Sequence, residues 1–158
     1  MAVTMNVRDA LNGAAGECYI TIGENRYNFM QVKSIEVTAE KQKTDVAILG
    51  RINKGHKSVG MSISGTATFH YNTSILRKAL LEYKKTGGDF YFEMQVTNQD
   101  PTSSVGRQTI VLKDCNIDSL TLAKLDADTD QTLDEEMDFT CEDWEMPESF
   151  TNVDGMES

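Results

Sequence analysis

The chain has 158 residues, 39% of them hydrophobic, and a formal net charge of −10 at pH 7. This length fits one domain with a buried core. Lys and Arg supply most of the affinity for nucleic acid backbones, so the acidic balance argues against nonspecific nucleic acid binding. The sequence has no apolar run of about eighteen residues and no secretory signal at its start. We therefore expect a soluble protein that is made in the cytoplasm and has no membrane anchor.

The first elements in chain order are a β-hairpin and two strands with alternating faces. GECYITI (16–22) and RYNFM (26–30) flank a Gly-Glu-Asn turn, which is typical of a hairpin. In SIEVTAE (34–40) and MSISGTATFH (61–70), apolar and polar residues alternate. This alternation predicts strands with one buried and one polar face. The polar residues are Ser34, Glu36, Thr38, Ser62, Ser64, Thr66, Thr68 and His70.

Between these two strands, residues 40–57 are interpreted as a long basic loop on an acidic protein. Its cations and its short apolar run are Lys41, Lys43, Val46, Ile48, Leu49, Arg51, Lys54 and Lys57. An apolar run on a charged loop is typical of a docking contact. It is equally typical of a plug that folds back on its own sheet, so the segment alone leaves both interpretations open.

One amphipathic helix is predicted within residues 73–88, where Leu76, Ala79 and Leu80 share a stripe. Lys84 and Lys85 suit its last turn, and a glycine follows them as a left-handed cap. FYFEMQVT (90–97) then alternates again. RQTIVLKDCNI (107–117) and DSLTLAKL (118–125) are predicted as two further strands.

The negative charge is concentrated at the end of the chain. Residues 126–158 carry thirteen carboxylates and no Lys or Arg, whereas residues 1–125 have a net charge of +3. The acids alternate with Leu133, Met137 and Phe139, which predicts a strand that displays an acidic face. That face comprises Asp134, Glu136, Asp138 and Glu142.

No set of residues in the sequence predicts catalysis. His56 and His70 are the only imidazoles; His56 lies in the basic segment, where neighbouring positive charge favours its neutral form, and His70 ends a predicted strand. Asp126, Asp128 and Asp130 resemble a calcium loop but lack its glycine at the sixth position. The three cysteines lie in apolar strands and are expected to be buried, inert thiols. We therefore expect a protein that is not an enzyme and that uses no cofactor and no metal ion.

Polar-faced strands, a basic segment and segregated charge favour a building block, because contacts between unlike surfaces generate rings or filaments. Three runs of the sequence carry a specific resemblance: residues 40–92, 108–128 and 133–149. They resemble, in order and over about residues 14–150, the tail tube proteins of contractile phage tails. The family includes the tubes of PBSX-type prophages and of R-type bacteriocins.

The resemblance implies a mainly β fold with one α-helix, a β-sandwich or barrel that forms one tail tube domain over residues 1–158. It implies hexameric rings stacked into a hollow tube, which sheath contraction drives through a target envelope. The particle would be a virion or a phage-tail-like particle assembled in the cytoplasm of the bacterial host. The implied partners are other copies of the chain, the sheath, baseplate and tail terminator proteins, and DNA that passes through the lumen without binding.

Three site assignments follow from the resemblance together with the patterns above. The polar rows of residues 34–38 and 62–70 line the lumen, and residues 40–57 contact a neighbouring subunit or ring. The acidic strand is the candidate for the surface that faces the sheath, and a basic loop on a neighbouring subunit is its alternative partner. Segments 1–13 and 148–158 are expected to be flexible or to order on assembly. Two alternatives are a monomeric β-sandwich module that binds carbohydrate or calcium, and the secreted tube protein of a type VI-like system.

Overall fold

The computed structural model describes residues 3–157, which fall into two compact units. Unit 1 comprises the described residues of 1–30, 90–114 and 143–158, and unit 2 comprises residues 31–89 and 115–142. Eight strands and a single α-helix make up nearly all the regular structure of the described chain, so the predicted mainly β fold with one α-helix is confirmed. A single tail tube domain over residues 1–158 stays a prediction, since two compact units can belong to one domain.

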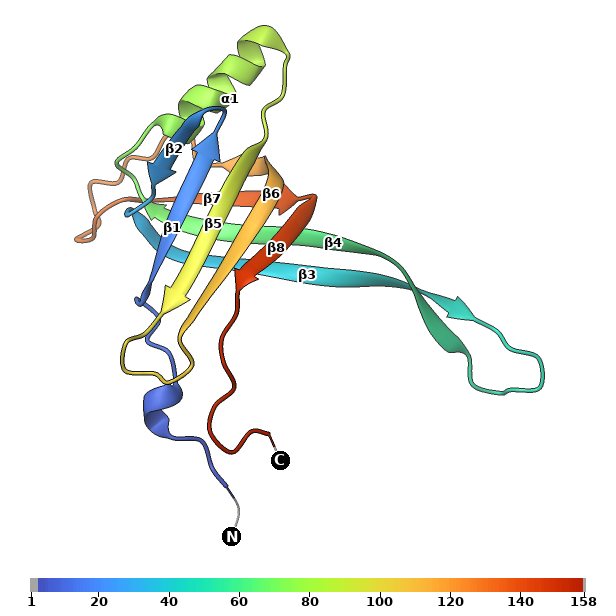
Figure 1. Cartoon of the computed structure of the whole chain (residues 1–158). Helices are drawn as coiled ribbons and strands as arrows, with labels where there is room; N and C mark the ends of the chain where they lie inside the picture. The colour runs from blue at the N-terminus through green and yellow to red at the C-terminus, as the bar shows by residue number, and fades with distance from the viewer. Residues whose placement is uncertain (1–2, 158) are drawn as a thin grey trace. The chain divides into compact units, whose positions relative to one another are not determined.

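Unit 1 is built on an antiparallel sheet (Figure 1). Its strands are β1 (Gly16–Ile22), β2 (Asn25–Asn28), β5 (Phe92–Gln99), the first half of β6 (Arg107–Leu120) and β8 (Asp143–Glu148). Their order is β2-β1-β5-β6, and β8 pairs with β6. Buried apolar residues of β1 and β5, such as Ile20, Phe92 and Met94, contribute its core.

Both terminal segments of the chain are tied to the loop between β5 and β6 in unit 1. A short 3-10 helix (Val7–Asp9) ends at Asp9, whose Oδ1 accepts hydrogen bonds from the backbone N and the Oγ of Ser104, at 2.9 and 2.6 Å. The backbone N of Thr151 donates to the carbonyl oxygen of Val105 at 2.8 Å. Parts of the segments predicted to be flexible, 1–13 and 148–158, are therefore held by hydrogen bonds within a single chain.

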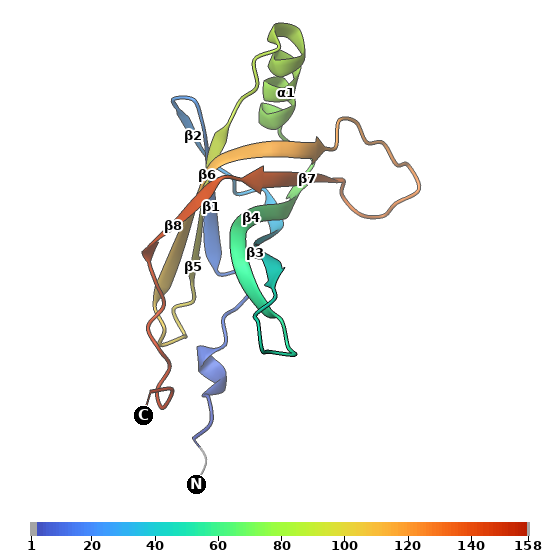
Figure 2. The ribbon, with the colours of Figure 1, turned by 90° about the vertical axis from the view of Figure 1, so that its right-hand side faces the viewer.

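Unit 2 is built on a second antiparallel sheet, with the order β6-β7-β4-β3. It contains β3 (Val32–Val46), β4 (Gly55–His70), α1 (Ile75–Thr86), β7 (Asp134–Cys141) and the second half of β6. Figure 2 shows the loop of residues 121–133 that leaves β6 and returns into β7. The core of unit 2 contains Ile63, Ala67 and Phe69 of β4 together with Met137 and Phe139 of β7.

The helix follows the prediction closely. Gly87 has a left-handed φ of 74°, and its N–H donates to the carbonyl oxygen of Tyr83 at 2.8 Å. Lys84 and Lys85 lie in the last turn, where they complement the helix dipole. No helix among residues 3–157 is long and apolar enough to cross a membrane.

Two strand predictions differ from the structure. One continuous strand, β6, replaces the two strands predicted at 107–117 and 118–125, and it ends at Leu120. The acidic run predicted as one strand is divided into β7 and β8 at Glu142. Where β6 passes from unit 1 to unit 2, Asp114 has a φ of 52°, a conformation that Asp tolerates better than most residues.

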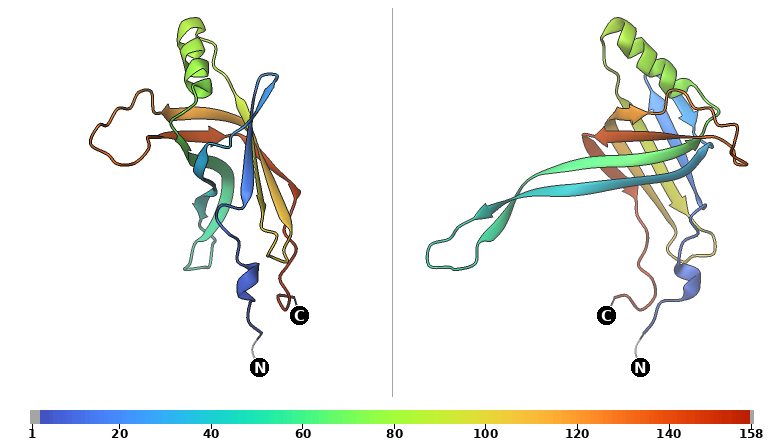
Figure 3. Two further views of the ribbon diagram at one scale, coloured as in Figure 1. Left: turned by 90° about the vertical axis from the view of Figure 1, so that its left-hand side faces the viewer. Right: turned by 180° about the vertical axis from the view of Figure 1, so that it is seen from behind.

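The basic loop predicted over residues 40–57 is mostly a β-ribbon. β3 and β4 stay paired from Glu40 opposite Ser62 to Val46 opposite Gly55, and only residues 47–54 lie outside the strands (Figure 3). Alternation is a weak signal here because the ribbon has no buried face: every residue from 39 to 54 is exposed. We call residues 47–54 the ribbon tip.

Candidate assembly surface

The polar residues of unit 2 form one continuous face across its sheet. Residues directly opposite each other on neighbouring strands project from the same side of a sheet. Pairing of β3 with β4 sets Glu36 opposite Thr66, and pairing of β4 with β7 sets Thr66 opposite Asp138. Pairing of β7 with β6 sets Asp138 opposite Ser119. The same register gives the rows Ser34, Thr68, Glu136 and Thr38, Ser64, Thr140, with Asn116 beside Thr140.

This register contradicts the separation of two site assignments. The predicted lumen residues of β4 and the predicted sheath residues Asp134, Glu136 and Asp138 of β7 lie on the same side of one sheet. They cannot face opposite surfaces of a tube. Alternation shows which residues of one strand share a face, but it does not show which strands are neighbours. The fourth sheath residue, Glu142, is exposed and lies between β7 and β8, in neither strand.

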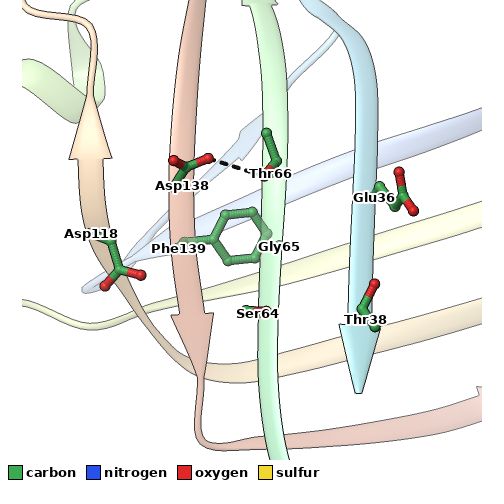
Figure 4. Close-up of a pocket in the computed structure, with 8 residues that line it drawn as sticks. All are labelled: Glu36, Thr38, Ser64, Gly65, Thr66, Asp118, Asp138 and Phe139. Atoms are coloured by element: carbon green, nitrogen blue, oxygen red, sulfur yellow. Dashed lines mark hydrogen bonds between the residues drawn. The ribbon is translucent and has the colours of Figure 1, made fainter. Parts of the chain in front are cut away.

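The middle of the polar face is an open hollow of about 330 Å³ (Figure 4). Glu36 and Thr38 line it from β3, Asp118 from β6 and Asp138 from β7. The Oγ1 of Thr66 donates to Asp138 at 3.0 Å, and the Oγ of Ser119 donates to the other oxygen of the same carboxylate at 3.1 Å. Hydroxyl groups therefore hold the Asp138 carboxylate on the face. The face presents acids and hydroxyls in alternation.

At the end of the polar face near His70, a lysine balances part of the negative charge. The Nζ of Lys33 lies 2.8 Å from the carboxylate of Asp134, and the Nδ1 of His70 lies 3.9 Å from its other oxygen. The hydrogen bond from Lys33 lowers the pKa of Asp134, so this carboxylate stays ionised in mild acid. No ion pair is found for Glu36, Glu136 or Asp138 within the described residues, so the centre of the face is negative.

A glycine beneath the hollow lets an aromatic ring reach the backbone. Gly65 pairs with Phe139, and a Cβ added at Gly65 would lie 2.6 Å from the ring of Phe139 and 3.0 Å from the carbonyl oxygen of Glu36. The buried ring of Phe139 thus occupies the space that a side chain at position 65 would need. This packing depends on the close approach of β7, β4 and β3 at Gly65.

Gly65→Ala is expected to lower the free energy of unfolding by about 1–3 kcal/mol, because the new methyl group overpacks the core face. Chemical denaturation of the purified protein measures this. Gly13→Ala is the matched control, since no atom lies within 4 Å of the Cβ it would add. Adding Phe139→Leu to Gly65→Ala should cost less than the two changes separately. Equal stability of the two glycine variants would show that the close packing is not limiting.

The sequence prediction missed a buried ion pair on the opposite face of the same sheet. Glu135 is 2% exposed, and its carboxylate accepts a hydrogen bond from Arg77 of α1. Arg77 also donates to the backbone oxygens of Thr73 and Thr121, and its guanidinium lies 4.5 Å from the ring centre of Tyr71. The sequence did contain a sign of this burial, because position 135 falls between Leu133 and Met137 in the apolar series that continues into β7.

The ribbon tip is the most exposed apolar group of unit 2. Leu49 and Ile52 are fully exposed, and Arg51 and Lys54 lie among them. Because the Gly55–Ser62 part of β4 pairs only with β3, both faces of the ribbon are open to solvent. The predicted contact residues from Lys41 to Lys57 therefore lie together on one extended, basic projection. The interpretation as a plug on the sheet of its own unit is contradicted by this exposure.

The acidic residues do not assemble a metal site. Within residues 3–157, no group of three or more His, Cys, Asp or Glu side chains is placed to hold a metal ion. In the segment that resembles a calcium loop, the carboxylate of Asp126 accepts a hydrogen bond from the backbone N of Asp128 at 3.0 Å. Asp126 therefore caps its own turn. All three cysteines are buried, as predicted.

Comparison with known proteins identifies close and distant relatives. The family model described as "Phage tail tube protein" matches residues 3–148. The chain is 35% identical over 151 residues to the phage-like element PBSX protein XkdM of Bacillus subtilis (strain 168), which covers 96% of this chain and 99% of the relative. Its fold is similar to that of a chain in the anti-feeding prophage baseplate, with a TM-score of 0.65, 14% identity and coverage of 92% and 97%. A chain of the PVC sheath-tube complex in its extended state gives a TM-score of 0.62, 12% identity and coverage of 89% and 93%.

Proposed function

The chain belongs to the phage tail tube protein family, and from this premise we propose that six copies form a ring and that such rings stack into a hollow tube. The role is that of a structural protomer, and we infer no catalytic step for it. The anti-feeding prophage baseplate, which contains a chain of similar fold, was described with six-fold symmetry. That similarity supports six copies in a ring.

The observation that carries the proposal is the unbroken polar face of unit 2. A sheet with one buried and one polar face needs water on the polar side, and a tube lumen supplies it. We infer that the lumen is lined by the predicted rows of β3 and β4, from Ser34 to Thr38 and from Ser62 to His70. Because they share that face, Glu136 and Asp138 are assigned to the lumen as well.

A lumen of this kind suits the passage of DNA without binding. Glu36, Glu136 and Asp138 repel phosphate groups, and the hydroxyls between them offer only weak hydrogen bonds that water can replace. Lys and Arg are the residues that retain a nucleic acid backbone. On this face the Nζ of Lys33 is already paired with Asp134. DNA would therefore pass along the lumen without meeting residues that bind its phosphate backbone.

The ribbon tip is our candidate for the contact between neighbouring copies. It lies beyond the Gly55 end of β4, whereas the pairing of His70 with Asp134 places the loop 121–133 at the other end of that strand. Arg51 and Lys54 give the tip a positive charge, and Asp126, Asp128 and Asp130 give the loop a negative charge. Contacts between opposite ends of two copies are head-to-tail, and such contacts propagate along an axis.

We propose that the sheath contacts a surface other than the polar face. The PVC complex with a chain of similar fold contains both sheath and tube, which supports a sheath as partner. Of the acidic residues predicted to face it, only Glu142 lies outside β7 and stays a candidate. Baseplate and tail terminator proteins are the proposed partners at the two ends of the tube. Assembly takes place in the cytoplasm of the bacterial host, before the particle is released.

Electron microscopy of the purified chain tests the proposal. We expect rings or tubes at high protein concentration, and a protein that stays monomeric under all conditions would contradict a self-assembling tube. Ser64→Cys then tests the direction of the polar face. In tubes, a maleimide carried by a bulky polymer should label this cysteine far more slowly than in monomers, while a small maleimide should still react. Equal labelling by the bulky reagent would place the face outside.

A further inference from the structure

Cys115 of β6 and Cys141 of β7 lie side by side on the buried face of unit 2. Asn116 pairs with Thr140, so the next position along the two antiparallel strands sets Cys115 opposite Cys141. Their Sγ atoms are 2.9 Å apart, and both side chains are buried. A disulfide bond is about 2.0 Å long, so a movement of about 0.9 Å would join the two sulfurs.

We propose that Cys115 and Cys141 are a redox pair that a peroxide converts into a disulfide linking β6 to β7 within one chain. The inference does not depend on tube assembly, because both cysteines belong to the same unit of the same chain. It also changes the prediction from the sequence that all three thiols are inert. The pair could not be recognised from the sequence, since its members are 26 positions apart along the chain.

The chemistry needs only the two thiols and one peroxide molecule. The thiolate of Cys141 attacks a peroxide oxygen, the O–O bond breaks, and the leaving oxygen takes up a proton to form water, which leaves a sulfenic acid on Cys141. The Cys115 sulfur then attacks the Cys141 sulfur, the S–O bond breaks, and a second water leaves. Two sulfurs are oxidised and the peroxide is reduced to two water molecules.

The surroundings make Cys141 the first sulfur to react. The hydrogen bond between the two thiols lowers the pKa of Cys141, which favours its thiolate. Cys141 is also the more accessible of the pair, at 9% exposure against 0% for Cys115. Cys18 in unit 1 lacks these features, since burial raises its pKa to about 12. The third cysteine is therefore an internal control.

The bond would form after the protein leaves the reducing environment in which it is made. Cytosolic thiols are kept reduced, whereas disulfides persist outside the cell. A disulfide between residues 115 and 141 closes a loop that contains the whole segment 121–133. Closing it lowers the entropy of the unfolded chain, so the oxidised form should unfold at a higher temperature.

The test uses the full chain treated with a small excess of hydrogen peroxide. Thiols counted after denaturation should fall from three to one, and peptide mapping should recover Cys115 joined to Cys141. The melting temperature should rise by roughly 5–10 °C and return to its original value with dithiothreitol. Cys18→Ser should behave in the same way, whereas Cys115→Ala and Cys141→Ala should each show no shift.

Three results would overturn the inference. They are three intact thiols after peroxide treatment, a disulfide that involves Cys18, and oxidation of Cys141 to a sulfinic acid without a crosslink. If either alanine variant fails to fold, the peptide map and the thiol count of the Cys18→Ser protein decide the question alone, since that protein contains only the pair.

Discussion

Arg77→Leu is expected to lower the free energy of unfolding at pH 7 by about 3–5 kcal/mol, because it leaves the carboxylate of Glu135 buried without its counter-charge. The loss extends beyond the ion pair. The backbone oxygens of Thr73 and Thr121 lose the donor that now bridges α1 to the end of β6. Chemical denaturation followed by circular dichroism measures the change.

The pH dependence distinguishes a charge effect from lost packing. Burial raises the pKa of Glu135 above its ordinary value of 4.5, and Arg77 offsets part of that rise. A carboxyl with a raised pKa stabilises the fold less as pH increases, because the unfolded chain releases its proton more easily. Without Arg77 the pKa of Glu135 rises further. The deficit of Arg77→Leu should therefore be largest near pH 7 and shrink as the pH falls to about 5.

Two variants control this experiment. The double change Arg77→Leu with Glu135→Leu removes both charges and should recover most of the stability, because no buried ion remains. Lys78→Leu changes an exposed cation in the next position of α1 and should shift stability by no more than about 0.5 kcal/mol. A deficit that stays constant between pH 5 and pH 7, or a double variant as unstable as Arg77→Leu, would show that packing and not charge is lost.

Reversing the charge of the ribbon should abolish assembly and leave the fold intact. The variant Lys41→Glu, Lys43→Glu, Lys54→Glu changes the charge of each copy by six units on a segment that has no contact with the core. A single exposed ion pair contributes only about 0–1 kcal/mol. In a tube, however, the contact is repeated by every copy, so a small loss per contact removes the long polymer.

Sedimentation and electron microscopy measure the result, and the melting temperature checks the fold. Lys78→Glu, Lys84→Glu, Lys85→Glu is the matched control, because it makes the same change of charge on the exposed side of α1. It should form tubes as the wild type does. Normal tubes from the ribbon variant would mean that this segment is not an assembly contact, whereas loss of tubes in both variants would point to total charge.

Much of the fold was predictable from the sequence because local rules dominate there. β1 has the predicted bounds, and α1 ends at the predicted glycine, since turn residues and capping act over a few positions. Local rules do not determine which strands are neighbours in a sheet. Nothing in the local pattern of β7 says that Asp138 lies beside Thr66, 72 positions earlier. The sequence interpretation therefore assigned two rows of one face to opposite surfaces of a tube.

The ribbon and the two buried pairs also could not be predicted from local sequence patterns. Residues 41–57 have no buried face, and therefore no period that marks them as strands. Glu135 and Arg77 are 58 positions apart, and the cysteines of the redox pair are 26 positions apart. Each member has an ordinary local setting, and only the packing of strands and helix reveals the partner. Glu135 alone could have been found, because its place in the alternation of β7 is an inward one.

β3 is the outermost strand of the unit 2 sheet, so its free edge is open to unwanted pairing before a copy is assembled. Fifteen residues of an edge strand expose a row of unpaired amides and carbonyls, which invites indiscriminate pairing and aggregation. Lys41 and Lys43 lie on this edge, and two such edges brought together would juxtapose like charges. Charge repulsion therefore disfavours pairing of the β3 edges of two newly made copies. The same lysines that keep the free chain from aggregating leave the edge open to a neighbour whose charge is complementary.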